Sequence, residues 1–154
     1  MSERAGPNPL VEVLIARLPH GEGLPLPSPA TSGSAGYDLA SAEEGELVPL
    51  ERRLFRTGFS IAVPDGYECQ LRPRSGLALR HGVTLPNTPA TIDSDYRGEL
   101  MVALVNLGAE RFRVTRGMRI AQMIVARVER VAFRPVDALP PSERGTGGFG
   151  SSGS

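Results

Sequence analysis

The side chains best suited to chemistry begin with a segment near the middle of the chain, PRSGLALRHG. There Arg74 and Ser75 stand directly before Gly76 and a short apolar stretch with helical spacing. A guanidinium, a hydroxyl and the backbone N–H groups at the start of a helix could converge on one anion, and phosphate matches that set of donors. The alternative is a plain strand-to-helix turn in which Ser75 caps the helix.

Two carboxylates stand where strands are expected to begin or end. Asp38 follows Gly-Tyr in AGYDL, where apolar alternation places its side chain near the core, and a buried aspartate needs a partner. Asp93 comes directly after Ile92 and could act as a general base for water held near an electrophile. Both also fit simpler roles, a turn-capping contact for Asp38 and ordinary turn chemistry for DSDYRG.

Further polar residues lie in LPNTPATIDSDYRGEL and in RIAQMIV. The first segment reads as a hairpin that carries Asn87, Asp95 and Tyr96, and the free backbone groups of such a hairpin can recognise a planar base. In the second segment Gln122 interrupts an apolar run. A buried amide must find hydrogen bonds, which a ligand or a neighbouring subunit could supply.

The last segment, RGTGGFGSSGS, contains the pattern G-x-G-x-x-G from Gly145 to Gly150. In the dinucleotide-binding fold this pattern works because a helix follows it, and no helix is expected to follow it here. The match therefore reflects either a flexible Gly/Ser tail or a phosphate-binding segment of another kind. Arg144 and Phe149 are the two residues that interrupt the small-residue composition.

Short strands are the elements expected to position these side chains. The sequence contains 18 glycines and 14 prolines, which punctuate it at roughly the 8–12-residue spacing of all-β folds. In FRTGFSIAV a period-two alternation indicates a half-buried strand whose inward residues are Phe55, Thr57, Phe59, Ile61 and Val63. VEVLIARL, YECQLRPR and ERFRVT read similarly, and only SGLALRHG indicates a helical turn. The pattern predicts a β-sandwich or jelly roll.

Two segments, ELMVALVNL and RIAQMIVARV, are apolar on both faces. In a small all-β protein this indicates either central strands or strands covered by another subunit, and oligomerisation is the economical explanation.

Composition sets limits on location and partners. The 154 residues fit a single domain, and the net charge of zero gives no footprint for nucleic acid or an anionic membrane surface. All 17 basic residues are arginines, which excludes a P-loop or Schiff-base lysine. The single Cys69 fits a reducing compartment. With no signal-peptide-like or membrane-spanning stretch, we expect a soluble cytoplasmic protein.

The ordered set of these segments carries a family resemblance. AGYDL, PRSGLA, TIDSDYRGEL, RIAQMIV and RGTGGFGSSG together resemble the five motifs of the trimeric dUTP pyrophosphatases, over Ala35 to Gly153. The resemblance implies a homotrimer of jelly rolls that hydrolyses dUTP to dUMP and pyrophosphate at sites shared among subunits. That reaction keeps uracil out of DNA and supplies dUMP for thymidylate synthesis. The resemblance also implies a Mg²⁺ ion held mainly by the substrate phosphates and, through water, by Asp38.

Roles for individual residues follow from the resemblance. Asp93 would orient and deprotonate the attacking water, and Tyr96 would pack against deoxyribose and exclude a 2′-hydroxyl. The segment from Asn87 to Tyr96 would recognise uracil. In the tail, Arg144 would contact the γ-phosphate and Phe149 would stack on uracil. The remaining substrate-binding residues that the resemblance implies are Arg74, Ser75, Gly76, Thr91, Ile92, Met101, Gln122, Gly148, Gly150 and Ser151.

The expected organisation is a jelly-roll domain over residues 1–143, with a loose stretch at 1–9, followed by a flexible active-site lid at 144–154. A dCTP deaminase shares the fold and the PRS segment but lacks the Ser-Asp-Tyr that follows Asp93. A non-catalytic nucleotide-binding protein would be expected to have lost the general base or the tail. One departure is Pro89-Ala90, where the family commonly has Pro-Gly. If the site needs a positive φ there, Ala90 adds strain of roughly 1 kcal/mol.

Overall fold

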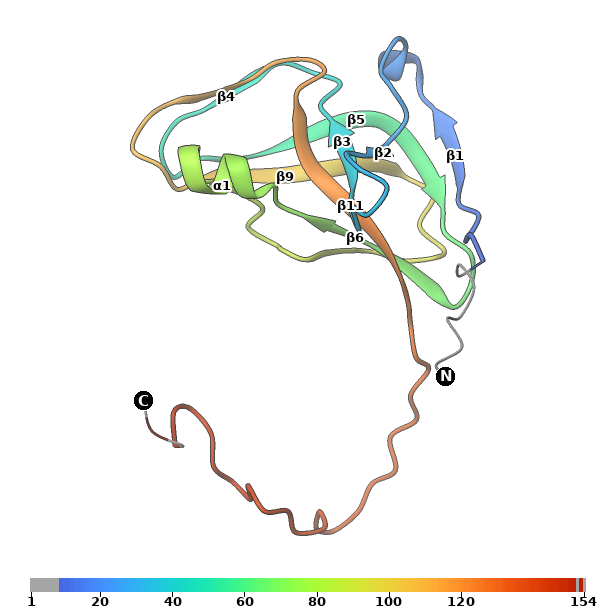
Figure 1. Ribbon diagram of the computed structural model, residues 1–154, viewed down its shortest axis with the longest axis vertical. Helices are drawn as coiled ribbons and strands as arrows, with labels where there is room; N and C mark the ends of the chain where they lie inside the picture. Colours follow the sequence, from blue (N-terminus) through green and yellow to red (C-terminus); the bar gives the residue numbers. More distant parts are fainter. Residues whose placement is uncertain (1–8, 152, 154) are drawn as a thin grey trace, which may run out of the picture.

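The computed structural model describes residues 9–151 and 153, so residues 1–8 of the predicted loose N-terminus lie outside the described residues. Eleven strands, one α-helix and one 3₁₀ helix make up the described part (Figure 1). The elements are β1 (Leu14–Arg17), η1 (Pro19–Gly21), β2 (Ser28–Pro29), β3 (Tyr37–Ala40), β4 (Gly45–Leu47), β5 (Arg52–Ala62), β6 (Tyr67–Arg72), α1 (Ser75–His81), β7 (Val83–Thr84), β8 (Ala90–Ile92), β9 (Glu99–Asn106), β10 (Phe112–Val114) and β11 (Arg119–Arg127).

Two sheets enclose the hydrophobic core. The strand order is β1-β5-β9-β7 in the four-stranded sheet and β2-β3-β11-β6-β8 in the five-stranded sheet, and β10 pairs with β4 in a small ribbon. Buried residues of β5 and β9, such as Phe55 and Leu104, share one cluster with Leu71 of β6 and Ile120 of β11. The prediction of an all-β sandwich of the jelly-roll type is confirmed.

The alternation predicted for strand β5 is confirmed, because all five residues expected to face inward are buried: Phe55, Thr57, Phe59, Ile61 and Val63. A bulge interrupts the pairing of β5 with β9 between Arg56 and Ser60. Within this stretch Phe59 belongs to a separate small cluster, with Leu24 and Ala42. A bulge inserts an extra residue and bends its strand, which re-aims the side chains that follow.

The strands predicted to be apolar on both faces are interior to their sheets. β9 lies between β5 and β7, and β11 lies between β3 and β6. The prediction of central strands is therefore confirmed. The outward face of β9 keeps Met101 exposed, while Ala103 and Val105 on the same face are half-buried.

Helix α1 connects the five-stranded sheet to β7. Its N-cap residue is Arg74, in an extended conformation and with no side-chain capping bond. The prediction that Ser75 caps the helix is wrong, because Ser75 is already the first helical residue. Gly82, with a left-handed φ of 68°, ends the helix and donates to the carbonyl of Ala78.

An extension follows the last strand. Residues 128–151 form an irregular segment: Val128 and Arg130 still bond to Gly66 and Asp65, and the chain then runs away from the β-rich body (Figure 1). The side chains of Val131, Phe133 and Leu139 are exposed in it. The boundary expected at residue 144, where the lid would begin, stays a prediction. Across the described part of the chain, no helix has the length and apolar character needed to cross a membrane.

Candidate active site

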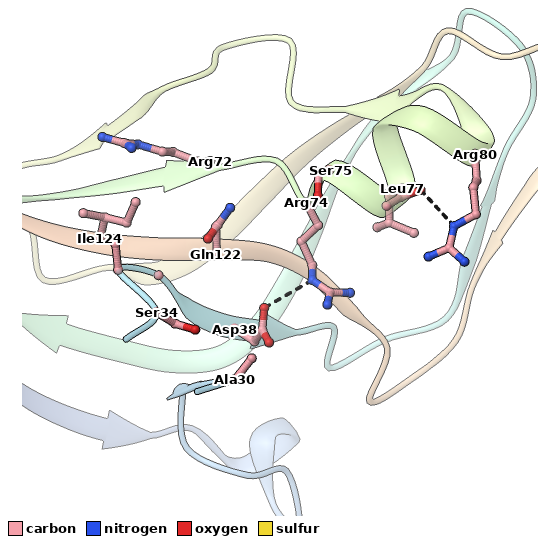
Figure 2. A pocket seen from close by; sticks show the side chains of 13 residues that line it. Ala30, Ser34, Asp38, Arg72, Arg74, Ser75, Leu77, Arg80, Gln122 and Ile124 are labelled. Carbon is pink, nitrogen blue, oxygen red and sulfur yellow. Dashed lines mark hydrogen bonds and ion pairs between the residues drawn. The ribbon is translucent and has the colours of Figure 1, made fainter. Parts of the chain in front are cut away.

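A pocket of about 500 Å³ opens between α1, β6, β3 and β11 (Figure 2). It brings together five of the residues singled out in the sequence, which come from three separate motifs: Asp38, Arg74, Ser75, Gly76 and Gln122. Its other lining residues are Ala30, Ser34, Ala35, Gly36, Arg72, Leu77, Arg80 and Ile124.

Asp38 is the acidic centre of this pocket. It lies within β3, its side chain is only 16 % exposed, and it forms ion pairs with Arg74 (Nε to Oδ1, 3.2 Å) and Arg119 (Nη1 to Oδ2, 3.4 Å). The prediction that a buried aspartate would require a partner is confirmed. The alternative of a turn-capping role is wrong, because Asp38 is inside a strand and its carboxylate faces two guanidinium groups.

Gln122 lies on β11 opposite Asp38, with which it is directly paired across the two strands. Its Nε2 donates to the carbonyl of Pro73 at 3.0 Å. The amide occupies the place that a Cβ on Gly36 would need, which explains the glycine before Tyr37 and Asp38. We expected a ligand or another subunit to supply the hydrogen bonds of the Gln122 amide. For the amide nitrogen this is wrong, because Pro73 of the same chain supplies the acceptor.

Three arginines of this region were not singled out in the sequence. Arg72 and Arg80 line the pocket, and Arg119 pairs with Asp38. With Arg74, the pocket lining contains three arginines (Arg72, Arg74 and Arg80) and one aspartate. This excess of positive charge suits a polyanion. Alternation along β6 could have identified Arg72, which stands two residues before Arg74. Arg119 carried no usable signal, because its contact depends on an irregular register with β3.

The segment from Asn87 to Tyr96 lies away from this pocket. β8 pairs with β6, with Ala90 opposite Leu71 and Ile92 opposite Cys69, whereas β7 and β9 belong to the other sheet. The segment is therefore not the predicted hairpin of two paired strands.

Asp93 follows β8 and lines a different hollow, beside Tyr67 and Glu68 at the start of β6. Arg72, which lines the pocket around Asp38, is at the other end of that strand. At about 3.3 Å per residue, the two ends of this six-residue strand are roughly 17 Å apart. A single chain does not bring Asp93 to the pocket.

Asn87 and Thr91 are exposed, and Ile92 is half-buried. Tyr96 is 41 % exposed, and its hydroxyl donates to the carbonyl of Glu99 at 3.0 Å. Met101 lies on the outward face of β9, opposite Arg56 of β5.

Ala90 is buried within β8 and is not among the residues with positive φ. The strain expected at this position is therefore absent.

The tail residues also lie apart from the pocket. Arg144 donates from Nε to the carbonyl of Gly147 at 2.7 Å, and Ser151 donates from its backbone to Gly148. Phe149 is fully exposed, and Gly150 has a positive φ of 86°. The hydrogen bonds described for this part of the extension are thus local.

The residues present do not form a metal centre on their own. No group of three or more His, Cys, Asp or Glu side chains gathers anywhere in the described residues. Asp38 is the single carboxylate of the pocket. Mg²⁺ prefers about six oxygen ligands and keeps several of its waters, so one carboxylate acting through water fits a metal whose other ligands come with the substrate.

A family model described as dUTPase matches residues 22–153 of the chain. The chain belongs to the dUTPase family. Its relatives include the deoxyuridine 5′-triphosphate nucleotidohydrolase of Zymomonas mobilis subsp. mobilis, which is 53 % identical over 143 residues, covering 93 % of this chain and 98 % of the relative. The protein of the same name from Rhizobium meliloti is 57 % identical over 143 residues, covering 90 % of this chain and 89 % of the relative.

Solved dUTPase structures share the fold. The dUTPase of Staphylococcus bacteriophage 80alpha, described with dUPNHPP, superposes with a TM-score of 0.84 at 25 % identity and covers 93 % of this chain and 99 % of that chain. The all-β architecture with one short helix is therefore that of the family.

Proposed function

We propose that the chain hydrolyses dUTP to dUMP and pyrophosphate in a Mg²⁺-dependent reaction, at active sites shared among the subunits of a homotrimer. The observation that carries the proposal is the arginine-lined pocket around Asp38, found in a chain of the dUTPase family.

The pocket of one subunit would bind the triphosphate. Arg74 lies at its centre, and its Nε now pairs with Asp38. The Ser75 hydroxyl and the backbone N–H of Gly76 offer neutral donors, and Arg72 and Arg80 add charge on either side. Guanidinium groups suit phosphate oxygens because they donate in pairs from a fixed plane.

The general base would come from a second subunit. Asp93 is exposed at the end of β8, and within one chain it is separated from the pocket by the length of β6. An active site that uses both Asp93 and the pocket around Asp38 therefore requires two copies of the chain. The apolar surface left open on one chain supports such an assembly: Leu54 and Met101 are exposed on the face of the four-stranded sheet, and Phe133 is exposed in the extension.

In the reaction, Asp93 would accept a proton from a water molecule whose oxygen attacks the α-phosphorus. The bond from that phosphorus to the bridging oxygen breaks, and pyrophosphate leaves with its electron pair. Arg74 and its neighbours would stabilise the negative charge that develops on the phosphoryl oxygens. Asp38 would hold Mg²⁺ through water, and the ion, when bound, supplies further charge neutralisation.

Specificity for the base and sugar is proposed for the segment that contains β8. The backbone between Asn87 and Ile92 would match the donor and acceptor edge of uracil. Thr91 would form part of the surface that packs against the base. Tyr96 would lie flat against deoxyribose and leave no space for a 2′-hydroxyl. Exclusion of one small group by a tight wall gives strong discrimination.

The extension is proposed to close over a neighbouring subunit's nucleotide. Arg144 would contact the γ-phosphate, Phe149 would stack on uracil, and the N–H groups of Gly148, Gly150 and Ser151 would surround the phosphates.

Pyrophosphate release with dUTP, dCTP, dTTP and UTP side by side tests the proposed function. Turnover of dUTP is expected to exceed that of the other three by orders of magnitude. Ammonia release from dCTP would instead identify a deaminase, and binding of dUTP without turnover would identify a nucleotide-binding protein.

A further inference from the structure

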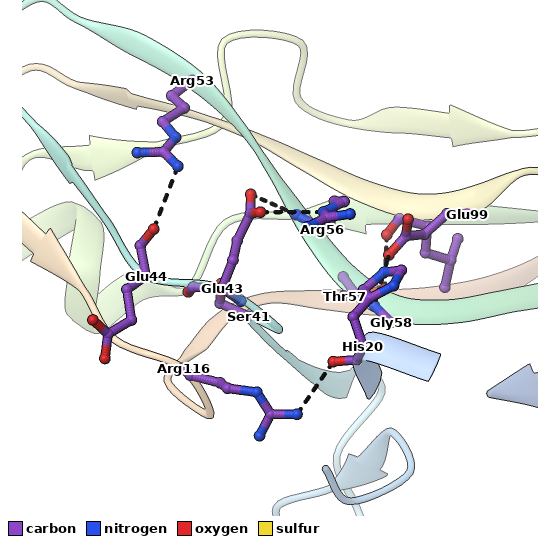
Figure 3. Close-up of polar contacts among 11 residues, drawn as sticks. His20, Ser41, Glu43, Glu44, Arg53, Arg56, Thr57, Gly58, Glu99 and Arg116 are labelled. Carbon is purple, nitrogen blue, oxygen red and sulfur yellow. Dashed lines mark hydrogen bonds and ion pairs between the residues drawn. The ribbon is translucent and has the colours of Figure 1, made fainter. Parts of the chain in front are cut away.

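A polar cluster outside the pocket lies at the bulge of β5 (Figure 3). Gly58 occupies the bulge with a positive φ of 78°. Its backbone N–H is turned away from the regular ladder and donates to Oε1 of Glu99, the first residue of β9, at 2.9 Å. A side chain thus supplies the acceptor that the strand pairing does not.

The same oxygen of Glu99 has a second partner. His20 Nε2 lies 2.5 Å from Glu99 Oε1, and the Glu99 side chain is only 9 % exposed. A carboxylate can only accept, so we assign the proton to Nε2 of His20. The buried end of Glu99 is therefore held by two donors from different parts of the chain.

His20 is itself fixed against the bulge. Leu18 donates from its backbone to the carbonyl of Gly58 at 2.8 Å, and Arg116 donates to the carbonyl of His20 at 3.2 Å. Gly21 lies so close to Gly58 that a Cβ on either glycine would overlap the other's backbone. The loop that contains η1 is thus held in one position relative to β5 and β9.

The backbone of Glu99 connects this cluster to Tyr96. The Glu99 carbonyl accepts the hydrogen bond from the Tyr96 hydroxyl, and the ring lies across Gly98, where a Cβ would overlap that hydroxyl. At the other end of the residue, the Tyr96 backbone donates to the carbonyl of Asp93 at 3.1 Å. The orientation of the ring therefore depends on where Glu99 is held.

We infer that His20 and Glu99 are positioning residues for Tyr96 and that their contact determines how strongly a 2′-hydroxyl is excluded. The inference rests on the proposed role of Tyr96 as the wall beside the sugar. A wall excludes a hydroxyl only while it does not move. Loss of the His20 contact leaves the Glu99 side chain with the Gly58 N–H as its remaining donor, so the end of β9 and the carbonyl that holds the ring are held less firmly.

The test compares kcat/KM for dUTP and UTP across variants. His20→Leu removes the donor and should reduce the preference for dUTP by roughly threefold to tenfold, mainly through faster use of UTP, the range that a lost hydrogen bond produces. His20→Gln keeps an N–H donor at similar reach and should restore most of the preference. Tyr96→Phe should resemble His20→Leu, and Tyr96→Ala should have the largest effect.

His81→Leu is the matched control, because His81 is the other histidine of the chain and lies on α1, outside this cluster. It should leave the preference unchanged. If His20→Leu lowers both rates equally or changes neither, while Tyr96→Ala relaxes the exclusion of UTP, the inference is wrong and the proposed role of Tyr96 stands. If Tyr96→Ala also leaves the exclusion intact, both are wrong.

A second measurement does not depend on activity. The chain has three tyrosines, so labelling with 3-fluorotyrosine should give three ¹⁹F resonances, with that of Tyr96 assigned by its loss in Tyr96→Phe. His20→Leu should shift or broaden the Tyr96 resonance and leave those of Tyr37 and Tyr67 in place. An unchanged Tyr96 resonance in His20→Leu overturns the inference.

Discussion

The pocket around Asp38 and the extension after β11 contain similar chemical groups, but the groups are fixed by contacts within the body in the pocket and make local contacts in the extension. In the pocket, Arg74 is held 3.2 Å from a carboxylate that is only 16 % exposed. In the extension, the bond described for the Arg144 side chain is to the nearby Gly147, and Phe149 is fully exposed. A phosphate bound in the pocket would find guanidinium and N–H groups already in place, whereas one bound by the extension would find them only after that segment had been ordered.

This difference determines what each region can recognise. Ordering about ten residues of the extension costs on the order of 10 kcal/mol of backbone entropy. Stacking of Phe149 on a base offers only about 1–3 kcal/mol. The extension should therefore close only when Arg144 also finds the terminal phosphate, and the pocket should bind a broader range of phosphates than the closed site does.

The largest effect is expected from Asp93, which belongs to neither region and is proposed to reach the pocket from another copy. Asp93→Asn keeps the size of the side chain but removes the basic oxygen, so kcat should fall by about 10²-fold or more while dUTP binding is retained. Steady-state kinetics and nucleotide titration measure the two quantities. Asp65→Asn, at an exposed aspartate outside the proposed binding segment, is the control and should turn over nearly normally. Normal turnover of Asp93→Asn would refute the general-base role.

A smaller effect is expected when two inactive chains are mixed. Asp93→Asn retains the extension, and a chain ending at residue 143 retains Asp93. If these parts reach one site from different subunits, random exchange should restore about a quarter of the sites. Activity is measured after unfolding and refolding the two chains together. No recovery in trimers shown to have exchanged would break the proposal of shared sites.

A smaller signal still is expected from a tryptophan placed in the extension. The sequence contains no tryptophan, so the emission of Phe149→Trp reports on the extension alone. With Mg²⁺ and a non-hydrolysable dUTP analogue the indole should lose solvent and change in intensity and wavelength, whereas dUMP should produce much less change. Removal of Arg144 in the same background should abolish the response and leave the trimer intact. Equal responses to dUMP and the analogue would contradict the lid.

The smallest effect, with no change in activity, concerns Cys69 in the interior of the body. Burial, with a smaller contribution from Glu68, raises the pKa of this thiol from 9.0 to about 11. Between these values the unfolded chain loses the proton while the folded chain keeps it. The contribution of the protonated Cys69 thiol to the free energy of unfolding is fully present below pH 9 and is lost as the pH rises toward 11.

Urea unfolding of the wild type and Cys69→Ala at pH 8 and pH 10.5 checks this contribution. The wild type should lose about 1–2 kcal/mol more than Cys69→Ala across that interval. Parallel losses in the two proteins would show that the thiol does not titrate as its burial implies.

Much of the β-rich body could be predicted from local patterns. The alternation around Phe55 identified β5, and the runs that are apolar on both faces identified β9 and β11 as central strands. Motif residues such as Asp38 and Arg74 are indeed brought together.

What could not be predicted depends on registers between strands. The Arg119 contact with Asp38 exists because the pairing of β11 with β3 shifts between Arg119 and Ala121. The bulge at Gly58 likewise turns a backbone N–H out of the strand pairing and toward the Glu99 side chain. Neither irregularity can be predicted from the hydrophobic pattern of a single strand, because each depends on how two strands are paired.

The charges that line the pocket have a consequence for the order in which metal and nucleotide bind. Asp38 already has two guanidinium partners, and the lining contains more arginines than carboxylates. A divalent cation arriving alone would meet repulsion and would have to displace an arginine from the one carboxylate that could hold it. A nucleotide already carrying the cation would reverse that balance, because its phosphates would attract Arg74 and leave Asp38 to hold the ion through water. Metal and substrate should therefore enter as one complex, so titration of the free enzyme with Mg²⁺ should give no saturable response until nucleotide is added.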